Sequence, residues 1–124
     1  MPLVSNQTKI VDLRSAEYIP AIITAAAAAY DAGDMVQEEE AAGFVLTDVA
    51  SGAKYSLIIK ADQVRALKVA EAIDAGDDVY YDLSAELFTK VATDNVLLGS
   101  CLEDAALGDD DVLMTFDGRS KTLV

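Results

Sequence analysis

The sequence predicts a mainly β domain, either a small β-barrel or a sandwich-like fold, with one candidate short helix and an extended N-terminal arm. Short runs of β-branched and aromatic residues recur through most of the chain, as they do in strands. Clusters of Asp, Asn, Gly and Ser separate these runs, which is the chemistry of turns. Only residues 61–76 space their apolar side chains in a way that suits a helix. With 124 residues, the chain fits one domain that buries a core of its own.

The first 17 residues show neither a helical nor a strand period. They are mixed and polar, so we expect an extended arm that is either loose or docked on another surface. Scattered apolar residues are the anchors by which this arm would contact a partner: Leu3, Val4, Ile10 and Leu13. We therefore divide the chain into an arm over residues 1–17, a β-rich domain over 18–118 and a frayed tail over 119–124.

Residues 18–30, "YIPAIITAAAAAY", are predicted to form a strand that enters a loop. The five consecutive alanines favour a helix, so a short helix is the alternative. Pro20, the β-branched residues that follow it and the nearby Gly33 favour the strand.

The next stretch is predicted as strands broken by turns. One strand begins at residues 35–37. The runs "GFVLTDV" at 43–49 and "KYSLIIK" at 54–60 then have the composition of a hairpin, and "ASG" at 50–52 supplies its turn.

The candidate helix is "ADQVRALKVAEAIDAG", residues 61–76. Its apolar residues roughly follow a 3.6-residue period, and Gly76 would end the helix. A strand through residues 64–70 is the alternative, because alternate positions there also differ in character.

Four short strands are predicted after this segment. Each is a run of apolar, β-branched or aromatic residues between turn clusters: residues 79–81, 87–89, 96–98 and 112–116. Several short strands spaced in this way are typical of a small barrel or sandwich.

The charge of the chain limits its partners. There are 22 acidic and 9 basic residues, a net charge of −13, and no Lys/Arg-rich run. Such a field repels nucleic-acid phosphates and anionic lipid headgroups, so we expect neither nucleic acid nor membrane as a partner. The N-terminus lacks the pattern of a secretory signal and the alanine-rich run is too short to cross a bilayer, so we expect a soluble protein.

Few residues are suited to catalysis or to cofactor binding. The chain has no histidine and a single cysteine, Cys101, in an apolar context. This composition excludes most zinc sites, most haem sites, and catalytic sites built on Cys–His or Ser–His pairs. The common phosphate-binding and nucleophile motifs are also missing from the sequence. We therefore expect no enzyme, no cofactor and no metal, and we expect Cys101 to be buried.

An eight-residue phrase occurs twice. "AYDAGDMV" at residues 29–36 and "AIDAGDDV" at 72–79 agree at six positions. An aspartic-protease dyad of Asp31 and Asp74 is one interpretation, but both copies lack the hydroxyl residue that braces such a loop. A calcium loop is another, but neither copy has the order of ligands that an EF-hand needs.

The interpretation that we favour for the phrase is geometric. Glycine accepts a positive φ, aspartate caps nearby backbone N–H groups, and the valine that follows opens a strand. The run "ALGDDDVLM" at residues 106–114 is a looser third use of the same chemistry. The predicted structural turns therefore contain Gly33 and Asp34, Gly76 and Asp77, and Gly108 and Asp109.

Lys54 supports an alternative function. It lies in "ASGAKYS", at a predicted hairpin tip, and biotinyl and lipoyl carrier domains display a lysine in this way. The residue before that lysine is normally Met or Asp, whereas here it is Ala53. An ordinary turn lysine is favoured, and a small non-enzymatic β carrier or binding module stays the alternative.

The order of these phrases resembles that of the small capsid cement, or head-decoration, proteins of tailed bacteriophages. In that family a Gly-Asp-x-Val strand entry precedes a G-V-x-L-T-D-x-A-x-G hairpin. A G-D-x-V-Y-W/Y-D strand and a closing hydrophobic-G-x-x-x-E-x-A-x-x-G-D segment follow. The matching positions of this chain are residues 33–36, 43–52, 76–82 and 98–109. The resemblance covers roughly residues 24–116; residues 1–23 match nothing in it, and 61–73 look more helical than the usual segment.

The resemblance implies a β-rich, barrel-like domain on the outer surface of the phage head in the virion, made in the bacterial cytoplasm. It also implies a homotrimer that bridges subunits of the major capsid protein and braces the shell against the packaged DNA. It carries over no catalytic residue. Our hypothesis for the arm is that its four apolar anchors contact the capsid or a neighbouring protomer.

Overall fold

Ten strands are described in the computed structural model, and the described residues contain no helix. The described residues are 3–8, 10–13, 18–23, 25–38, 41–119 and 121–123. In these ranges there is accordingly no helix that could span a membrane. The strands are β1 (Leu3–Thr8), β2 (Ile10–Leu13), β3 (Tyr18–Ile23), β4 (Asp34–Glu38), β5 (Ala41–Val45), β6 (Tyr55–Leu67), β7 (Asp78–Asp82), β8 (Leu87–Thr89), β9 (Val96–Ser100) and β10 (Asp111–Asp117).

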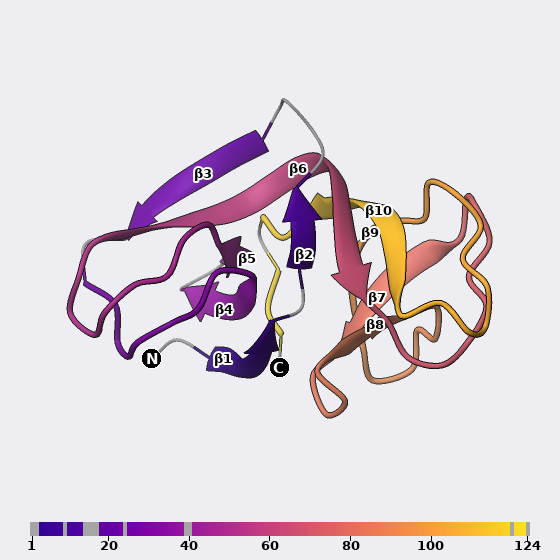
Figure 1. The fold of residues 1–124 in the computed structure, drawn as a ribbon, viewed down its shortest axis with the longest axis horizontal. Coiled ribbons are helices and arrows are strands. Elements are labelled where there is room, and N and C mark those ends of the chain that lie inside the picture. The colour runs from indigo at the N-terminus through magenta and orange to yellow at the C-terminus, as the bar shows by residue number, and fades with distance from the viewer. Residues whose placement is uncertain are drawn as a thin grey trace.

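The strands form two antiparallel sheets (Figure 1). The larger has the order β1-β4-β5-β6-β10, and β2 and β3 also pair with β6. The smaller has the order β8-β7-β9. The long strand β6 runs from one lobe of the molecule to the other. Among the described residues the sheets do not close into a barrel, so the predicted mainly β, sandwich-like fold is confirmed and its barrel form is not.

The same arrangement of strands occurs twice. A first unit consists of β3, β4, β5 and the first part of β6; a second consists of the last part of β6, β7, β9 and β10. In the first unit β3 pairs with β6, with Ala21 opposite Leu57. In the second, β6 pairs with β10 in the same sense, with Val64 opposite Met114. Each of these two ladders contains one register shift. Because β6 pairs with β3 in the first unit and with β10 in the second, it is the last strand of one unit and the first strand of the next.

The hairpins of the two units also correspond. Met35 lies opposite Phe44 where β4 pairs with β5, and Asp78 lies opposite Ser100 where β7 pairs with β9. On its other edge β4 pairs with β1, and β7 pairs with β8. The N-terminal strand β1 thus occupies in the first unit the place that β8 holds in the second, where β8 follows β7 in the sequence and lies on the edge of β7 opposite β9.

One hydrophobic core holds the two units together. The larger cluster of buried residues draws on both units. At its centre the rings of Phe44 and Phe116 pack edge to face, with their centroids 5.7 Å apart. A second cluster lies within the first unit, between the loops and strands that carry Ala26, Tyr30, Val36, Val45, Tyr55 and Leu57.

The predicted helix at residues 61–76 is wrong, and the alternative, a strand through residues 64–70, is found as far as Leu67. Residues 61–67 continue β6 as a strand, which pairs with β10 on one side and β2 on the other. Val64 and Ala66 are fully buried, whereas Arg65 between them is partly exposed and bonded to Asp111 at 2.9 Å. This alternation has the period of a strand, and pairing on both sides overrides the helical propensity of the alanines and leucine.

Several predicted strands are confirmed. Residues 18–23 form β3, and the four strands predicted in the second half correspond to β7, β8, β9 and β10. The hairpin predicted over 43–60 is the antiparallel pair of β5 and β6, in which Phe44 lies opposite Ile58. The turn between these strands contains Gly52, with a φ of +82°.

The N-terminal residues form strands that pair within the chain. β1 pairs with β4 and β2 pairs with β6. Residues 14–17 and the side chains of the four predicted anchors lie outside the described part of the structure. What Leu3, Val4, Ile10 and Leu13 contact therefore stays a prediction.

Candidate functional site

The first copy of the repeated phrase forms a tight turn before β4. The N–H of Asp31 donates to Oδ2 of Asp34 at 2.9 Å, and the N–H of Asp34 donates back to the carbonyl of Asp31 at 3.1 Å. Gly33 has a φ of +91°, a conformation that residues with a Cβ rarely adopt. The carboxylate thus caps the backbone of its own turn.

The second copy repeats this geometry before β7. The N–H of Asp74 donates to Oδ2 of Asp77 at 3.0 Å, the N–H of Asp77 donates to the carbonyl of Asp74 at 3.0 Å, and Gly76 has a φ of +94°. The looser third copy has the same pair of bonds between Ala106 and Asp109, at 2.9 and 3.0 Å.

A second aspartate, in the segment that follows β5 or β9, binds the backbone of each of the first two turns. Oδ1 of Asp48 accepts the N–H of Ala32 at 2.8 Å. Oδ1 of Asp104 accepts the N–H of Ala75 at 2.8 Å. The bracing residues are 56 positions apart and the turns 43, so the duplication extends beyond the repeated letters. These carboxylates bind backbone N–H groups, and the described residues contain no group of three or more potential metal ligands.

Asp34 is buried, whereas Asp77, its counterpart in the second turn, is partly exposed. Burial is the largest cause that raises the pKa of Asp34, which is 6% exposed. The folded protein therefore holds this proton more tightly than the unfolded chain does, and ionising Asp34 at neutral pH reduces stability. This cost disappears as the pH falls below the unfolded carboxyl pKa, about 3.9.

We expect Asp34→Asn to raise the urea midpoint of unfolding at pH 7 and to leave it unchanged at pH 3. An asparagine still accepts the N–H of Asp31, so the turn is preserved. Asp77→Asn, at the same place in the second unit, controls for the loss of one negative charge. An equal gain for Asp34→Asn at both pH values would contradict the prediction.

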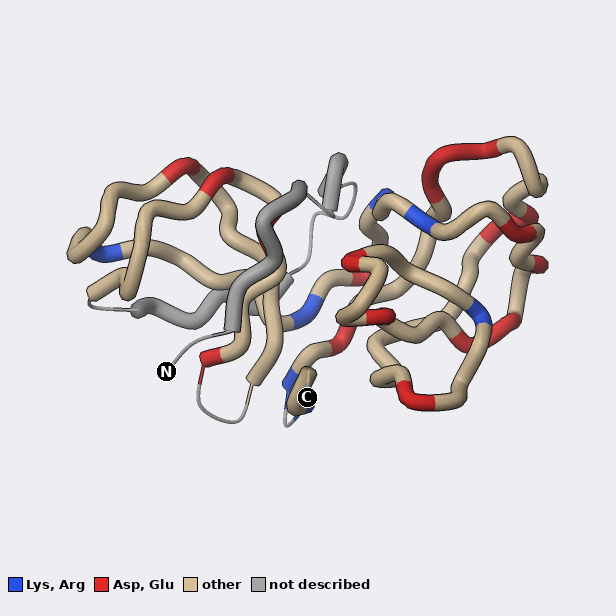
Figure 2. The backbone as a smooth tube through the Cα atoms, turned by 90° about the horizontal axis from the view of Figure 1, so that it is seen from below, with Lys and Arg blue, Asp and Glu red and all other residues tan. Residues whose placement is uncertain are grey.

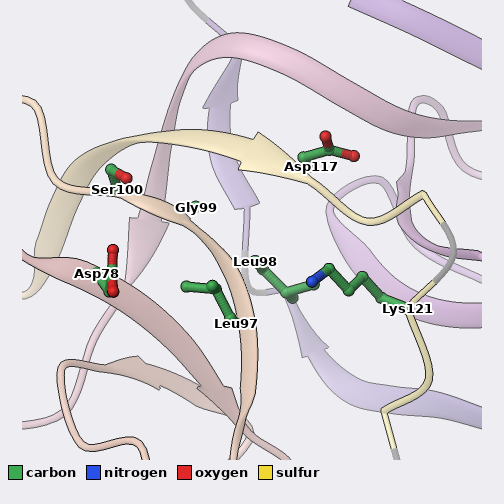
Figure 3. A pocket seen from close by; sticks show the side chains of 7 residues that line it. All are labelled: Asp78, Leu97, Leu98, Gly99, Ser100, Asp117 and Lys121. Atoms are coloured by element: carbon green, nitrogen blue, oxygen red, sulfur yellow. The ribbon is translucent and has the colours of Figure 1, made fainter.

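A pocket of about 220 Å³ lies beside β9 (Figure 3). This open pocket is bordered by the start of β7, one flank of β9, the end of β10 and the segment that follows β10. Its lining residues are Asp78, Leu97, Leu98, Gly99, Ser100, Asp117 and Lys121. None of them was predicted as a site residue. One signal was present: "VLL" at 96–98 breaks the alternation of a half-buried strand, so one apolar side chain must face outward.

The pocket has an apolar floor and a charged rim. Leu98 is buried, while Leu97 beside it is 38% exposed. Asp117 is already engaged: its Oδ2 lies 3.0 Å from Nη2 of Arg119, and hydrogen bonding from Arg119 is the main cause that lowers the pKa of Asp117. Within the described part of the chain Asp78 and Lys121 form no ion pair.

Cys101 and Lys54, the two reactive side chains weighed from the sequence, are not arranged for chemistry. Cys101 is buried as predicted, its Sγ lies 3.0 Å from the carbonyl oxygen of Glu103, and burial raises the pKa of its thiol. A raised pKa keeps a thiol protonated and unreactive. Lys54 is exposed but follows the turn that the bond from Ala53 to Ala50 closes, so it is not at the tip.

The surface charge is uneven between the two lobes. Acidic positions are denser in the loops of the lobe that holds β7, β8 and β9 (Figure 2). At equivalent strand positions of the two units, Met35 in β4 is buried in the core, whereas Asp78 in β7 is exposed and lines the pocket. The second unit is therefore the more polar of the two copies.

Comparison with known proteins identifies one family. A family model described as phage cement protein matches residues 16–116. The matched range contains both structural units, all three turns and most of the pocket beside β9, and it begins after β2. No curated protein matches the chain.

Proposed function

Because the chain belongs to the phage cement protein family, and is therefore a structural protein of the phage capsid, we propose that it binds the outside of the assembled head and stabilises the shell. The family is structural, which agrees with a fold whose carboxylates serve turns. The observation that supports the proposal most is the extent of the match, which covers both units of the duplicated domain.

The proposed partner is the major capsid protein, and the proposed assembly is a homotrimer that bridges its subunits. A small domain with an apolar pocket and strand edges offers the means to bind such a partner. The net charge of −13 supports a position on the outer surface of the virion, away from the packaged DNA. Synthesis in the bacterial cytoplasm follows from a role in head assembly. The proposed role requires no cofactor and no catalytic residue.

Binding to empty phage heads tests the function. The purified protein is mixed with expanded heads that lack it, and bound copies are counted by gel densitometry and located by electron microscopy. We expect saturable binding on the outer surface and a higher temperature of shell disruption. Absence of binding, or binding without any gain in shell stability, would reject the proposal.

We further propose that the N-terminal arm contributes to this binding through Leu3, Val4, Ile10 and Leu13. Deleting residues 2–14 should weaken binding to heads by about tenfold or more, because apolar residues at an interface core contribute most of the binding energy. The deletion spares the range that matches the family but removes β1 and β2, which pair with β4 and β6, so circular dichroism has to show that the remaining domain is folded before its binding is compared.

The control for the arm is a protein in which residues 2–14 have the same composition in a shuffled order. It separates the effect of specific anchors from that of chain length and charge. If the deleted and shuffled proteins bind heads as tightly as the original, the arm has no part in binding.

A further inference from the structure

The N-terminal strand β1 and the segment that follows β10 meet at one residue of β4. The ladder between β1 and β4 places Leu3 opposite Gln37. The segment after β10 binds the side chain of the same glutamine: Nε2 of Gln37 donates to the carbonyl of Lys121 at 3.0 Å, and the N–H of Leu123 donates to Oε1 at 2.7 Å. In Figure 1 both segments lie near β4. Both also lie outside residues 16–116, the range that matches the family.

The segment after β10 is anchored at both ends of its described length, and we call it the strap. At its start, Gly118 donates its N–H to the carbonyl of Ile59 in β6 and accepts the N–H of Ala42 in β5, both at 2.8 Å. A Cβ on Gly118 would overlap the carbonyl oxygen of Ala42, so this junction has no room for a side chain. At the far end, Leu123 is 4% exposed and belongs to the same core cluster as Met35 of β4.

Loss of the strap would act on β4 directly. Gln37 is 6% exposed, so its amide would lose two bonded partners in a buried place, which costs more than the loss of a hydrogen bond at the surface. Loss of Leu123 would also leave a gap in the core cluster that contains Met35. Both effects fall on the strand with which β1 pairs.

β1 depends on such support more than its counterpart β8 does. Only residues 83–86 join β8 to β7, whereas residues 9–33 separate β1 from β4. The longer connection makes the pairing of β1 costlier in chain entropy. Among the described residues, the ladder with β4 is also the only one that holds β1, which is the last strand at its end of the larger sheet.

We propose that the strap holds β1 on β4, so that the two ends of the chain are released together. The coupling is reciprocal, because a change that loosens one segment from β4 loosens the other by the same free energy. β1 belongs to the N-terminal arm, so the strap controls how readily this arm leaves the domain. The inference concerns the free protein and does not depend on the proposed function.

Hydrogen exchange of the purified protein, followed by mass spectrometry, tests the coupling. Leu123→Asp places a charge at a core position and should detach the strap. Peptides from β1 should then exchange about fivefold faster or more, while peptides from β8 change little. Lys121→Ala is the matched control. It makes the same change in net charge, and Gln37 binds the backbone carbonyl of Lys121, so exchange in β1 should stay within about twofold.

Two deletions complete the test. Deletion of residues 119–124 covers the case in which Leu123→Asp unfolds the protein, because it removes the far end of the strap and leaves Gly118 with its two backbone bonds. Deletion of residues 2–8 tests the coupling from the other end of the chain. It should accelerate exchange in the peptide that contains Leu123 by a factor similar to that seen in β1.

The result in β1, compared with that in β8, decides the inference. Unchanged exchange in β1 after loss of the strap overturns it, as does unchanged exchange in the strap after loss of β1. Equal acceleration in β1 and β8 overturns it too, because the strap would then stabilise the whole domain and not β1 in particular.

Discussion

Gly99→Ala is expected to lower the free energy of unfolding by about 3 kcal/mol or more, at the upper end of the cost of overpacking. A Cβ at this position would overlap the carbonyl oxygen of Thr115 and would lie 3.0 Å from Cε of Met114. The obstacle is the backbone of β10, which cannot move aside as a flexible side chain does. β9 and β10 would have to separate where Ser100 donates its N–H to Oγ1 of Thr115 at 2.9 Å.

Gly108→Ala is the matched control for this substitution. No atom lies within 4 Å of a Cβ built on Gly108, and its φ is not in the left-handed region. The change should therefore alter stability by no more than about 0.5 kcal/mol. Urea unfolding followed by circular dichroism measures both midpoints, with a constant slope showing that the transition is unchanged. Equal midpoints for the two variants would show that β9 and β10 separate at little cost.

Strands could be predicted from the sequence where a short apolar run lies between two clusters of turn residues. β8 coincides with the run Leu87–Thr89, because apolar residues there lie between two clusters of turn residues. The duplication was visible only in its turns. Both copies keep the glycine with positive φ and the capping aspartate, whereas Met35 and Asp78 at one equivalent position share no chemistry.

The helix prediction failed because it used only the spacing of apolar residues within 61–76. Which of these residues are buried depends on strands that are distant in the sequence. Lys68 illustrates this: it was placed on a helix, yet it is 5% exposed. Its Nζ donates to the carbonyl of Glu71 at 2.6 Å, which compensates the burial of its charge. A pairing partner more than 40 residues away, β10, determines the conformation of residues 61–67. The alternation over residues 64–70 allowed a strand, but it does not show that such a partner exists.

The pocket beside β9 depends on long-range placement for the same reason. Its walls come from β7, β9 and the segment after β10, which meet only in the folded chain. The three consecutive apolar residues of "VLL" signalled an outward-facing leucine, but they did not show that Asp78 and Ser100 pair where the first unit pairs Met35 with Phe44. The exchange of Met35 for Asp78 can be read from the repeated stretch of sequence, whereas the exchange of Phe44 for Ser100 follows only from the strand pairing in the two units.

Phe116→Ala should have the other large effect, a loss of about 3–5 kcal/mol in the free energy of unfolding. Phe116 is 1% exposed, lies opposite Ala61 in the ladder of β10 and β6, and packs its ring against Phe44 at an interplanar angle of 71°. Ala61 is the residue at which the first unit passes into the second. The side chain therefore fills the junction of the two units, where surrounding strands that are fixed at both ends cannot collapse into the space.

The same substitution tests whether the two units fold as one. The larger core cluster draws residues from both units, so Phe116→Ala should still unfold in a single transition, at a thermal midpoint lower by about 10–20 °C. Leu107→Ala, at a side chain that is 63% exposed, should change the midpoint little and serves as the control. Two separate transitions in Phe116→Ala would show that the duplicated units are joined mainly by this ring. A loss below about 1 kcal/mol would show that the junction repacks around the cavity, and the rigid contact between the units inferred from the Phe44–Phe116 pair would then be wrong.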